Sequence, residues 1–270
     1  MGDEDGAPRL IASEADLDAA IARLAERDPG TVGHLLSVGG RPPLRRGEPG
    51  FEGLASIVVS QQVSTASAAA IFGRLGLALR RPKARHFDAH DLAAADDAVL
   101  RALGLSAGKV ATLRAAAAAV RDGSLPLADL GTLPDGDVAR RLLAIRGIGP
   151  WTAELFRLVC LGHADAWPAG DLALQEAARI ALKLEARPDT AGLAAIGERW
   201  RPDRGVAARL LWSYYRAMKM SDGIGVAAGR ASALASPADK MPCDGDGSTS
   251  GRVVTGPVPA PPCSRRPGGT

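Results

Sequence analysis

The sequence has few cysteines. It contains three among 270 residues, of which Cys243 and Cys263 lie in a segment rich in glycine, proline and serine, while Cys160 lies in an apolar stretch. This usage excludes a framework of disulfides. Three thiolates are also fewer than the four that hold an iron–sulfur cluster. We therefore expect no structural metal.

Long apolar runs and a secretion signal are absent as well. No apolar run in the sequence approaches the roughly 18 residues that a membrane span requires. The first ten residues, MGDEDGAPRL, are acidic and lack the basic and then apolar order of a signal peptide. We therefore expect a cytoplasmic protein with no membrane partner.

A strong excess of one charge is also missing. The formal net charge is +3, and residues 219–270 carry six Lys or Arg against four Asp or Glu, so that segment alone contributes +2. The rest of the chain is close to neutral, and its overall charge is weak evidence for a nucleic-acid partner.

The apolar residues recur with the period of helices. Ser13 to Asp16 forms a capping-box pattern, followed by an apolar face that ends near Pro29 and Gly30. Residues 51–77 read as helical with a break near 60–64, and further helices are expected over 106–121, 135–145, 152–161, from 171, over 189–199 and over 204–218. No segment alternates with period two, so the fold is predicted to be all-α. We place a folded domain at 8–220 and a disordered tail, rich in Gly, Ala, Ser and Pro, at 221–270.

One predicted helix pair is joined by an unusual turn, in the segment LLAIRGIGPWTAE at 142–154. One glycine is enough to end a helix, and proline is tolerated in the first turn of the next. Two glycines around Ile148 also remove side chains that would keep a partner from the backbone, while Ile148 enters the core. Amides at the start of the helix from Pro150 favour an anion. The pattern predicts a phosphate-binding hairpin, with a plain helix-to-helix turn as the alternative.

A second motif, AWPAGDLAL, places Asp171 at the start of a helix, where aspartate is an ordinary N-cap. The hairpin by itself resembles the helix-hairpin-helix, which binds the sugar-phosphate backbone of DNA and also occurs in polymerases, ligases and junction-binding proteins. Together, the hairpin, the loop and an aspartate twenty positions after Trp151 resemble the helix-hairpin-helix DNA glycosylases, in the 3-methyladenine DNA glycosylase II branch.

The resemblance covers residues from about 10 to 218. The segment QQVSTASAAAIFGRL is similar to the family's helix that presents a wedge to DNA, and ERWRPDRGVAARLLWSYY is similar to its C-terminal helices. The resemblance implies two helical lobes with a cleft between them. Larger bacterial members carry an additional N-terminal lobe that contains β-structure, for which this chain has no room.

The resemblance also implies an activity, the excision of a flipped-out alkylated purine such as 3-methyladenine or 7-methylguanine. Asp171 is then the catalytic carboxylate, which stabilises the positively charged sugar and orients or deprotonates water. Trp151, Trp212 and Tyr215 are expected in the base pocket, where electron-rich rings favour a cationic base. Relatives that also cut the backbone place a lysine at the position of Trp151, so we expect a monofunctional enzyme that leaves an abasic site.

Contacts with DNA follow from the same resemblance. Gln62 is the expected wedge and Gln61 its neighbour, and the alternative is that both glutamines cap a helix junction. The expected backbone contacts come from the amides of Gly147, Gly149 and Trp151, the hydroxyl of Thr152, and the side chains of Arg146 and Lys109. For both side chains, and for the basic segment at 80–85, the alternative is a solvated surface charge.

The expected partner is double-stranded DNA that contains damaged bases, bound by a monomer without a cofactor. Family members often hold a monovalent cation between the hairpin and a phosphate. Two other functions stay open at this point. One is a glycosylase of the same fold for uracil, hypoxanthine or oxidised bases, and the other is a non-catalytic protein that recognises DNA structure.

Overall fold

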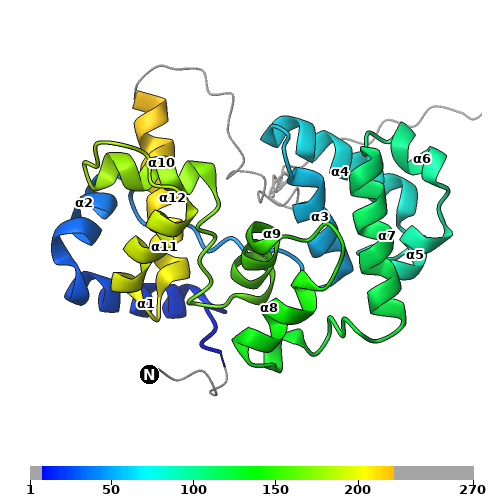
Figure 1. Ribbon diagram of the computed structural model, residues 1–270, viewed down its shortest axis with the longest axis horizontal. Coiled ribbons are helices and arrows are strands. Elements are labelled where there is room, and N and C mark those ends of the chain that lie inside the picture. Colours follow the sequence, from blue (N-terminus) through cyan, green and yellow to red (C-terminus); the bar gives the residue numbers. More distant parts are fainter. Residues whose placement is uncertain (1–7, 222–270) are drawn as a thin grey trace, which may run out of the picture. The chain divides into compact units, whose positions relative to one another are not determined.

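The computed structural model describes residues 8–221, and these residues form helices and no strand. One isolated bridge joins Leu10 and His163. The helices are α1 (Glu14–Arg27), α2 (Pro29–Gly39), α3 (Phe51–Ser60), α4 (Thr65–Leu79), α5 (Ala89–Ala94), α6 (Asp97–Ala102), α7 (Ala107–Arg121), η1 (Leu130–Thr132), α8 (Asp135–Leu143), α9 (Pro150–Leu155), η2 (Phe156–Leu161), α10 (Leu172–Ala181), α11 (Thr190–Gly197), η3 (Glu198–Trp200) and α12 (Arg204–Ser221) (Figure 1). The all-α prediction is confirmed for this part of the chain. The predicted tail lies outside the described residues, apart from Ser221 at the end of α12.

Local signals account for most helix boundaries. The predicted capping box is present, since the Ser13 hydroxyl accepts from the amide of Asp16 and the Asp16 carboxylate accepts from the amide of Ser13. The Pro29-Gly30 pair was expected only to end a helix, but Pro29 also opens α2, with Asp28 as its N-cap. Proline suits this first position because no hydrogen bond is needed from its nitrogen there.

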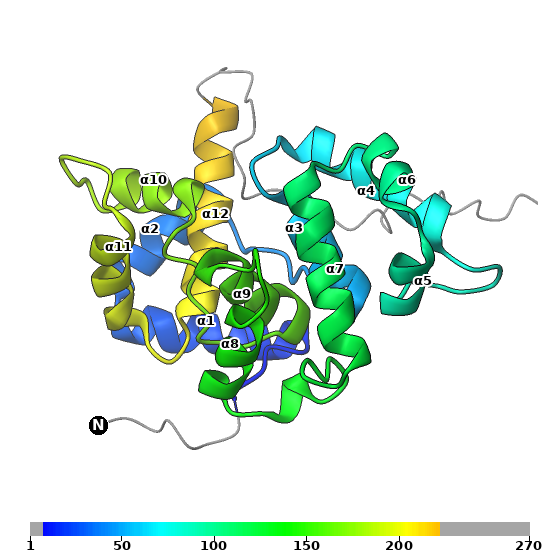
Figure 2. The same cartoon turned by 45° about the vertical axis from the view of Figure 1, so that its right-hand side comes forward.

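Two hydrophobic cores organise the helices into two lobes. One core is built mainly from α3 to α9, and the other from α1, α2 and α10 to α12. Figures 1 and 2 both show α4 to α7 on one side, the α1, α2 and α10 to α12 group on the other, and α8 and α9 between them. The segment η2 contributes Phe156 to the first core and Leu158 to the second, and Trp212 packs against both. The lobes therefore meet along η2 and α12.

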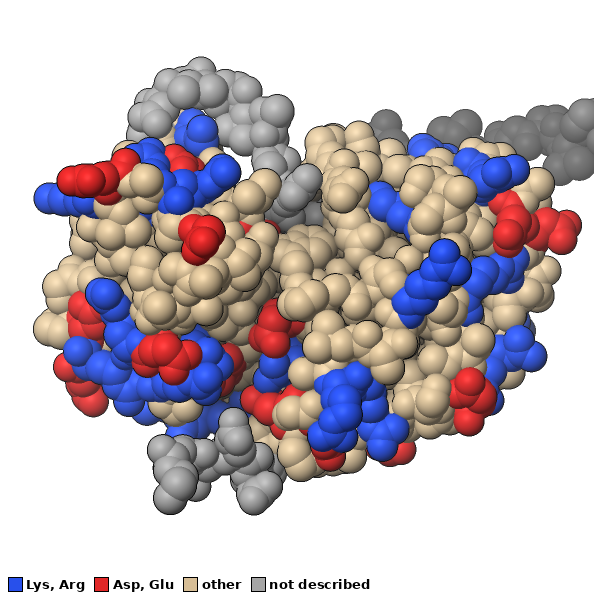
Figure 3. Space-filling model, viewed as in Figure 1, with Lys and Arg blue, Asp and Glu red and all other residues tan. Residues whose placement is uncertain are grey.

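The distribution of surface charge does not by itself indicate a binding face. On the face shown in Figure 3, Lys and Arg side chains are interspersed with Asp and Glu and do not gather in one basic patch. Within residues 8–221, no helix has the length and apolarity that crossing a membrane would take.

Candidate active site and DNA-binding hairpin

The turn between α8 and α9 has the predicted hairpin form, but its two glycines have different roles. Gly147 has φ +85°, and a Cβ added there would lie 1.9 Å from Oγ1 of Thr112 in α7. Gly149 has φ −97°, and an added Cβ would meet nothing within 4 Å. Gly147 therefore fits closely against α7, whereas a side chain at Gly149 would face open space. Gly147 is itself exposed, and the backbone-amide contacts expected from both glycines stay predictions. Ile148 is 5% exposed and enters the first core, as predicted.

The loop that follows α3 is tied to the hairpin by a side-chain hydrogen bond. Nε2 of Gln61 donates to Oγ1 of Thr152 over 2.9 Å, and Thr152 is only 2% exposed. The Thr152 hydroxyl thus faces Gln61 inside the protein, not the surface where a phosphate contact was expected. Gln62 is exposed and has φ 56°, in the left-handed region. The loop therefore holds one glutamine inward and presents the other to solvent.

Lys109 and the first two arginines of the basic segment at 80–85 are engaged within the protein, while Lys83 and Arg85 in that segment are exposed. The Lys109 ammonium donates to the carbonyl oxygen of Val59 over 2.7 Å, at the end of α3, and its burial lowers its pKa. Arg80 pairs with the buried carboxylate of Glu52, and Arg81 bonds to Asp91 over 2.9 Å. These residues hold helices together, and the phosphate contact of Lys109 stays a prediction. Arg146 is exposed in the hairpin, as expected.

Asp171 is an N-cap and the centre of the site at once. The side chain caps α10, because its Oδ1 accepts from the amide of Leu174 over 2.8 Å. Nε1 of Trp151 also donates to Oδ2 over 2.9 Å, and Nε1 of Trp212 donates to Oδ1 over 3.2 Å. Asp171 is 1% exposed. The fold thus gathers three of the predicted site residues, from α9, the start of α10 and α12.

The loop before Asp171 is fixed at several points. The amide of Asp171 donates to the carbonyl oxygen of Pro168 over 2.9 Å, and Nε2 of Gln175 donates to that of Ala169 over 2.9 Å. Oε2 of Glu154 accepts from the amide of Trp167 over 2.8 Å. Because the loop is bonded to both flanking helices, Asp171 is held in one position relative to the hairpin.

Tyr215 takes a different position from the two tryptophans. It packs against the second core, and the ammonium of Lys219 lies 5.5 Å from the centre of its ring. Among the described contacts it has no hydrogen bond to Asp171. Its place in a base pocket therefore stays a prediction.

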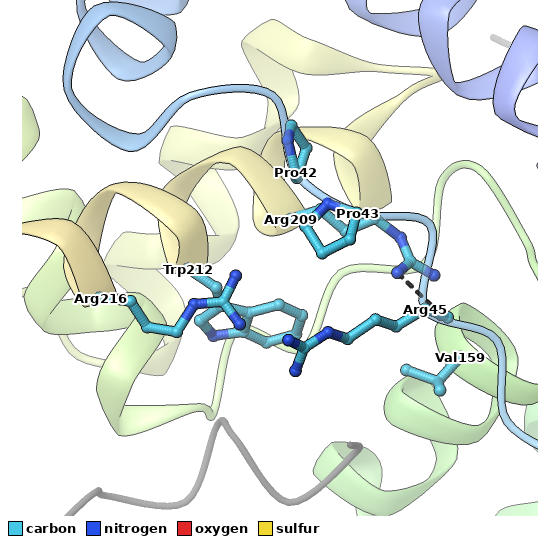
Figure 4. Close-up of a pocket in the computed structure, with 7 residues that line it drawn as sticks. All are labelled: Pro42, Pro43, Arg45, Val159, Arg209, Trp212 and Arg216. Atoms are coloured by element: carbon cyan, nitrogen blue, oxygen red, sulfur yellow. Dashed lines mark hydrogen bonds between the residues drawn. The ribbon is translucent and has the colours of Figure 1, made fainter. Parts of the chain in front are cut away.

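Sequence reasoning missed a basic pocket that Trp212 also lines. Figure 4 shows this pocket, which is lined by Pro42, Pro43, Arg45, Val159, Arg209, Trp212 and Arg216. A signal was present in the sequence, because Arg209, Trp212 and Arg216 are spaced three and four residues apart and so share one face of a helix. The contribution of Arg45, from the segment between α2 and α3, has no such signal.

The chain is similar to known DNA repair proteins. Residues 55–202 match the family model described as HhH-GPD superfamily base excision DNA repair protein. A Mycobacterium tuberculosis protein named probable bifunctional transcriptional activator/DNA repair enzyme AlkA is 35% identical over 217 residues, covering 76% of this chain and 41% of the relative, so the chain spans about two fifths of that relative's length. DNA-3-methyladenine glycosylase 1 of Schizosaccharomyces pombe is 30% identical, covering 63% of this chain and 73% of the relative.

A solved structure supports the same assignment. The 3-methyladenine DNA glycosylase of S. pombe, in complex with abasic DNA, matches with a TM-score of 0.65 and 29% identity, covering 76% of this chain and 97% of that one. Together with the hairpin, the loop and Asp171, these similarities confirm the family that the sequence motifs indicated. The chain belongs to the HhH-GPD superfamily of base excision DNA repair proteins.

Proposed function

We propose that this protein is a monofunctional DNA glycosylase that excises alkylated purines from double-stranded DNA. The observation that carries the proposal is the buried carboxylate of Asp171, which accepts from the indole nitrogens of both Trp151 and Trp212. A structural N-cap needs only the bond to the amide of Leu174. Two further donors from separate helices place a fixed negative charge between two electron-rich rings.

The reaction requires the damaged nucleotide to leave the duplex, which costs a few kcal/mol of stacking and pairing. In this proposal Gln62, exposed at the tip of the α3–α4 loop, fills the gap in the DNA. The Gln61–Thr152 bond fixes that loop to the hairpin. The hairpin amides around Gly149 bind the sugar-phosphate backbone, because Gly149 at the start of α9 carries no side chain of its own to keep the strand away.

At the site, the bond between C1′ and the base nitrogen breaks, and the base leaves with the bonding electrons. The sugar then carries positive charge, which the Asp171 carboxylate stabilises. A water oxygen bonds to C1′, and its proton passes to the carboxylate or to solvent. A carboxylate has about four acceptor positions, so one is left for the sugar or the water after the three N–H donors. Because Asp171 is 1% exposed, an indole must move before a nucleotide can reach it.

The choice of an alkylated purine is supported by the aromatic rings and by the names of the relatives. Alkylated bases such as 3-methyladenine are cationic, so they depart with little protonation and are attracted to indole faces. The relative in S. pombe is named DNA-3-methyladenine glycosylase 1. We propose double-stranded DNA as the partner on the strength of the hairpin, and a monomer as the active form.

The absence of a lyase step is part of the proposal. A lyase needs an amine that forms a Schiff base with the sugar. The side chain nearest the Asp171 carboxylate from the hairpin is Trp151, whose indole nitrogen is not a nucleophile of that kind. Borohydride should therefore trap no covalent complex between the protein and abasic DNA, and a trapped complex would contradict this part of the proposal.

The test is base release from methylated duplex DNA by the native protein and by Asp171→Asn. We expect the variant to lose at least about 10²-fold in rate while it still binds abasic DNA. Asp189→Asn is the matched control, because Asp189 caps α11 in the same way, accepting from the amide of Gly192 over 2.7 Å. It should release base at the native rate. Equal rates for both variants would refute the catalytic role of Asp171.

The lesion is tested separately from the reaction. A panel of duplexes with alkylated, deaminated and oxidised bases should show the highest rate for alkylated purines. Release only from uracil, hypoxanthine or an oxidised purine would retain the reaction and reject the substrate class. Binding to abasic DNA with no release from any duplex would favour a protein that only recognises DNA structure.

A further inference from the structure

The pocket beside Trp212 contains three arginines that are buried to different degrees. Arg209 is 7% exposed, Arg216 is half-buried and Arg45 is exposed. In Figure 4 the guanidinium groups of Arg45 and Arg216 extend toward the indole of Trp212, beneath Pro42 and Pro43. Two of the arginines come from α12, and the third comes from the segment between α2 and α3. The pocket is therefore a positively charged recess with an aromatic wall.

These arginines are not neutralised by the rest of the described chain. None of the three forms an ion pair with a carboxylate among residues 8–221, although arginines elsewhere in this part of the chain, such as Arg157 and Arg204, do. Arg209 donates to the carbonyl oxygens of Arg45 and Leu158, over 3.0 and 3.1 Å, and its Nε is buried without a partner. A buried cation that bonds only to carbonyls is a costly arrangement unless something else balances it.

The pKa values of two of these arginines are lowered, as expected from their burial and from the positive charges beside them. Burial, followed by the charge of Arg46, lowers the pKa of Arg209 to about 10. Burial, followed by the charge of Arg45, lowers the pKa of Arg216. Both shifts reflect the cost of holding a positive charge in this position, a cost that a bound anion would offset.

The pocket adjoins the proposed catalytic site through a single side chain. Trp212 donates from Nε1 to Asp171, and the same indole lines the arginine pocket. The same indole therefore contacts both the pocket and the Asp171 carboxylate. Guanidinium groups are donors only, so the pocket suits an anion rather than a cationic alkylated base.

We propose that Arg45 and Arg216 bind one phosphate of the DNA strand that carries the flipped nucleotide, with Arg209 as a fixed positive charge behind them. This inference rests on the proposed function, because it takes DNA as the partner. The site is separate from the hairpin, where the ligands are backbone amides. Arginine suits phosphate because its planar fork donates two parallel hydrogen bonds. The hairpin amides and the arginine pocket would then hold the strand at two separate places.

The experiment uses the full chain and a duplex with a tetrahydrofuran abasic analogue, with affinity measured by fluorescence anisotropy over a range of salt. The double variant Arg45→Gln/Arg216→Gln should bind about fivefold more weakly at physiological salt, with a salt slope shallower by about 0.9, as expected for one lost phosphate contact. The matched control is Arg27→Gln/Arg121→Gln, which removes the same charge at exposed helix ends and should keep the native slope.

Methylphosphonates identify the phosphate itself. Replacing phosphates near the abasic analogue one at a time should reveal one position that weakens the native protein but not the double variant. If the double variant binds like its control, or if every replacement weakens both proteins equally, the proposal is overturned. Inorganic phosphate serves as the second probe. If free phosphate binds the native protein but not the double variant, while the double variant binds DNA as the native protein does, the pocket is a site for free phosphate and the DNA contact is overturned.

Failure of the phosphate-site proposal can be distinguished from failure of the proposed glycosylase function. Binding to the abasic analogue involves no chemistry, so the arginine result stands whether or not the protein releases methylated bases. Conversely, base release that depends on Asp171 while the double variant binds normally would uphold the glycosylase and reject the phosphate site. Arg45→Lys/Arg216→Lys keeps both charges and should restore the salt slope, and thermal unfolding confirms that each variant is folded.

Discussion

The indole nitrogen of Trp151 donates a hydrogen bond of 2.9 Å to Oδ2 of Asp171, a residue twenty positions later in the chain. The bond joins the hairpin to the start of α10, so the element expected to bind DNA also positions the carboxylate. Trp212 bonds to the other oxygen from α12. A change in the hairpin is therefore transmitted directly to the proposed catalytic group.

Trp151→Phe removes this donor while retaining an aromatic ring. We expect it to destabilise the fold by about 1.5–3 kcal/mol, because a buried carboxylate oxygen loses its partner. We also expect base release to fall by at least about tenfold, since Asp171 is less firmly held. Urea unfolding and a single-turnover excision assay measure the two effects.

Trp167→Phe is the control for that prediction. The Trp167 indole donates to the carbonyl oxygen of Leu193 over 3.0 Å and has no bond to Asp171. Its loss should cost about 1 kcal/mol of stability and leave the excision rate unchanged. Equal loss of activity in both variants would mean that the Trp151 effect is only one of stability.

The two hairpin glycines provide a second prediction. Gly147→Ala should destabilise the fold by about 2 kcal/mol or more, because it combines a positive φ with a close contact to Thr112. Gly149→Ala should leave the melting temperature within about 1 °C, since its Cβ meets nothing within 4 Å. The second variant should still bind abasic DNA several-fold more weakly, because the methyl group lies where the DNA backbone is expected. Native affinity in Gly149→Ala would contradict the proposed phosphate contact at the hairpin.

The sequence predicts these features unevenly, for physical reasons. Helix caps such as Ser13 and Asp171 are local signals, and they appear in the structure as expected. The fit of Gly147 against Thr112 depends on the packing of α7, which is thirty-five residues away and leaves no trace in the turn itself. The Gln61–Thr152 bond joins residues 91 positions apart. Likewise, nothing near Arg45 indicates that it meets α12, so the basic pocket is visible only in three dimensions.

Gln62 provides a test of the wedge that separates flipping from chemistry. The side chain is exposed on a left-handed residue, so Gln62→Gly should not strain the loop, and Gln62→Ala is a second variant with a Cβ. Both should release base from duplex DNA roughly tenfold more slowly, because a wedge is needed only where a partner strand closes the gap. Release from single-stranded DNA with the same lesion should be unchanged. An equal loss on both substrates would assign Gln62 a role in the site rather than in flipping.

Asp135, at the start of α8, should make the stability of the fold depend on pH in the acid range. Burial alone would raise the pKa of Asp135, but the contact with His163 and the charge of Arg157 outweigh it and lower the pKa to about 2. Arg157 lies 2.7 Å from this carboxylate and is itself buried. A pKa below the ordinary 3.8 means that the unfolded chain takes up the proton first. The contribution to stability is therefore complete above 3.8 and lost as the pH falls through about 2.

Asp135→Asn should consequently destabilise the fold at pH 6 by about 1 kcal/mol, a small value because the carboxylate is partly exposed to solvent. The difference from the native protein should shrink as the pH approaches 2, where the native carboxylate also becomes neutral. Urea unfolding at pH 6, 4 and 3 measures it. Asp137→Asn is the control, since Asp137 pairs with the exposed Arg140 on the same helix, and its small effect should come from that surface pair alone. A difference for Asp135→Asn that is the same at pH 3 as at pH 6 would show that Asp135 acts by packing and not by its charge on Arg157 and His163.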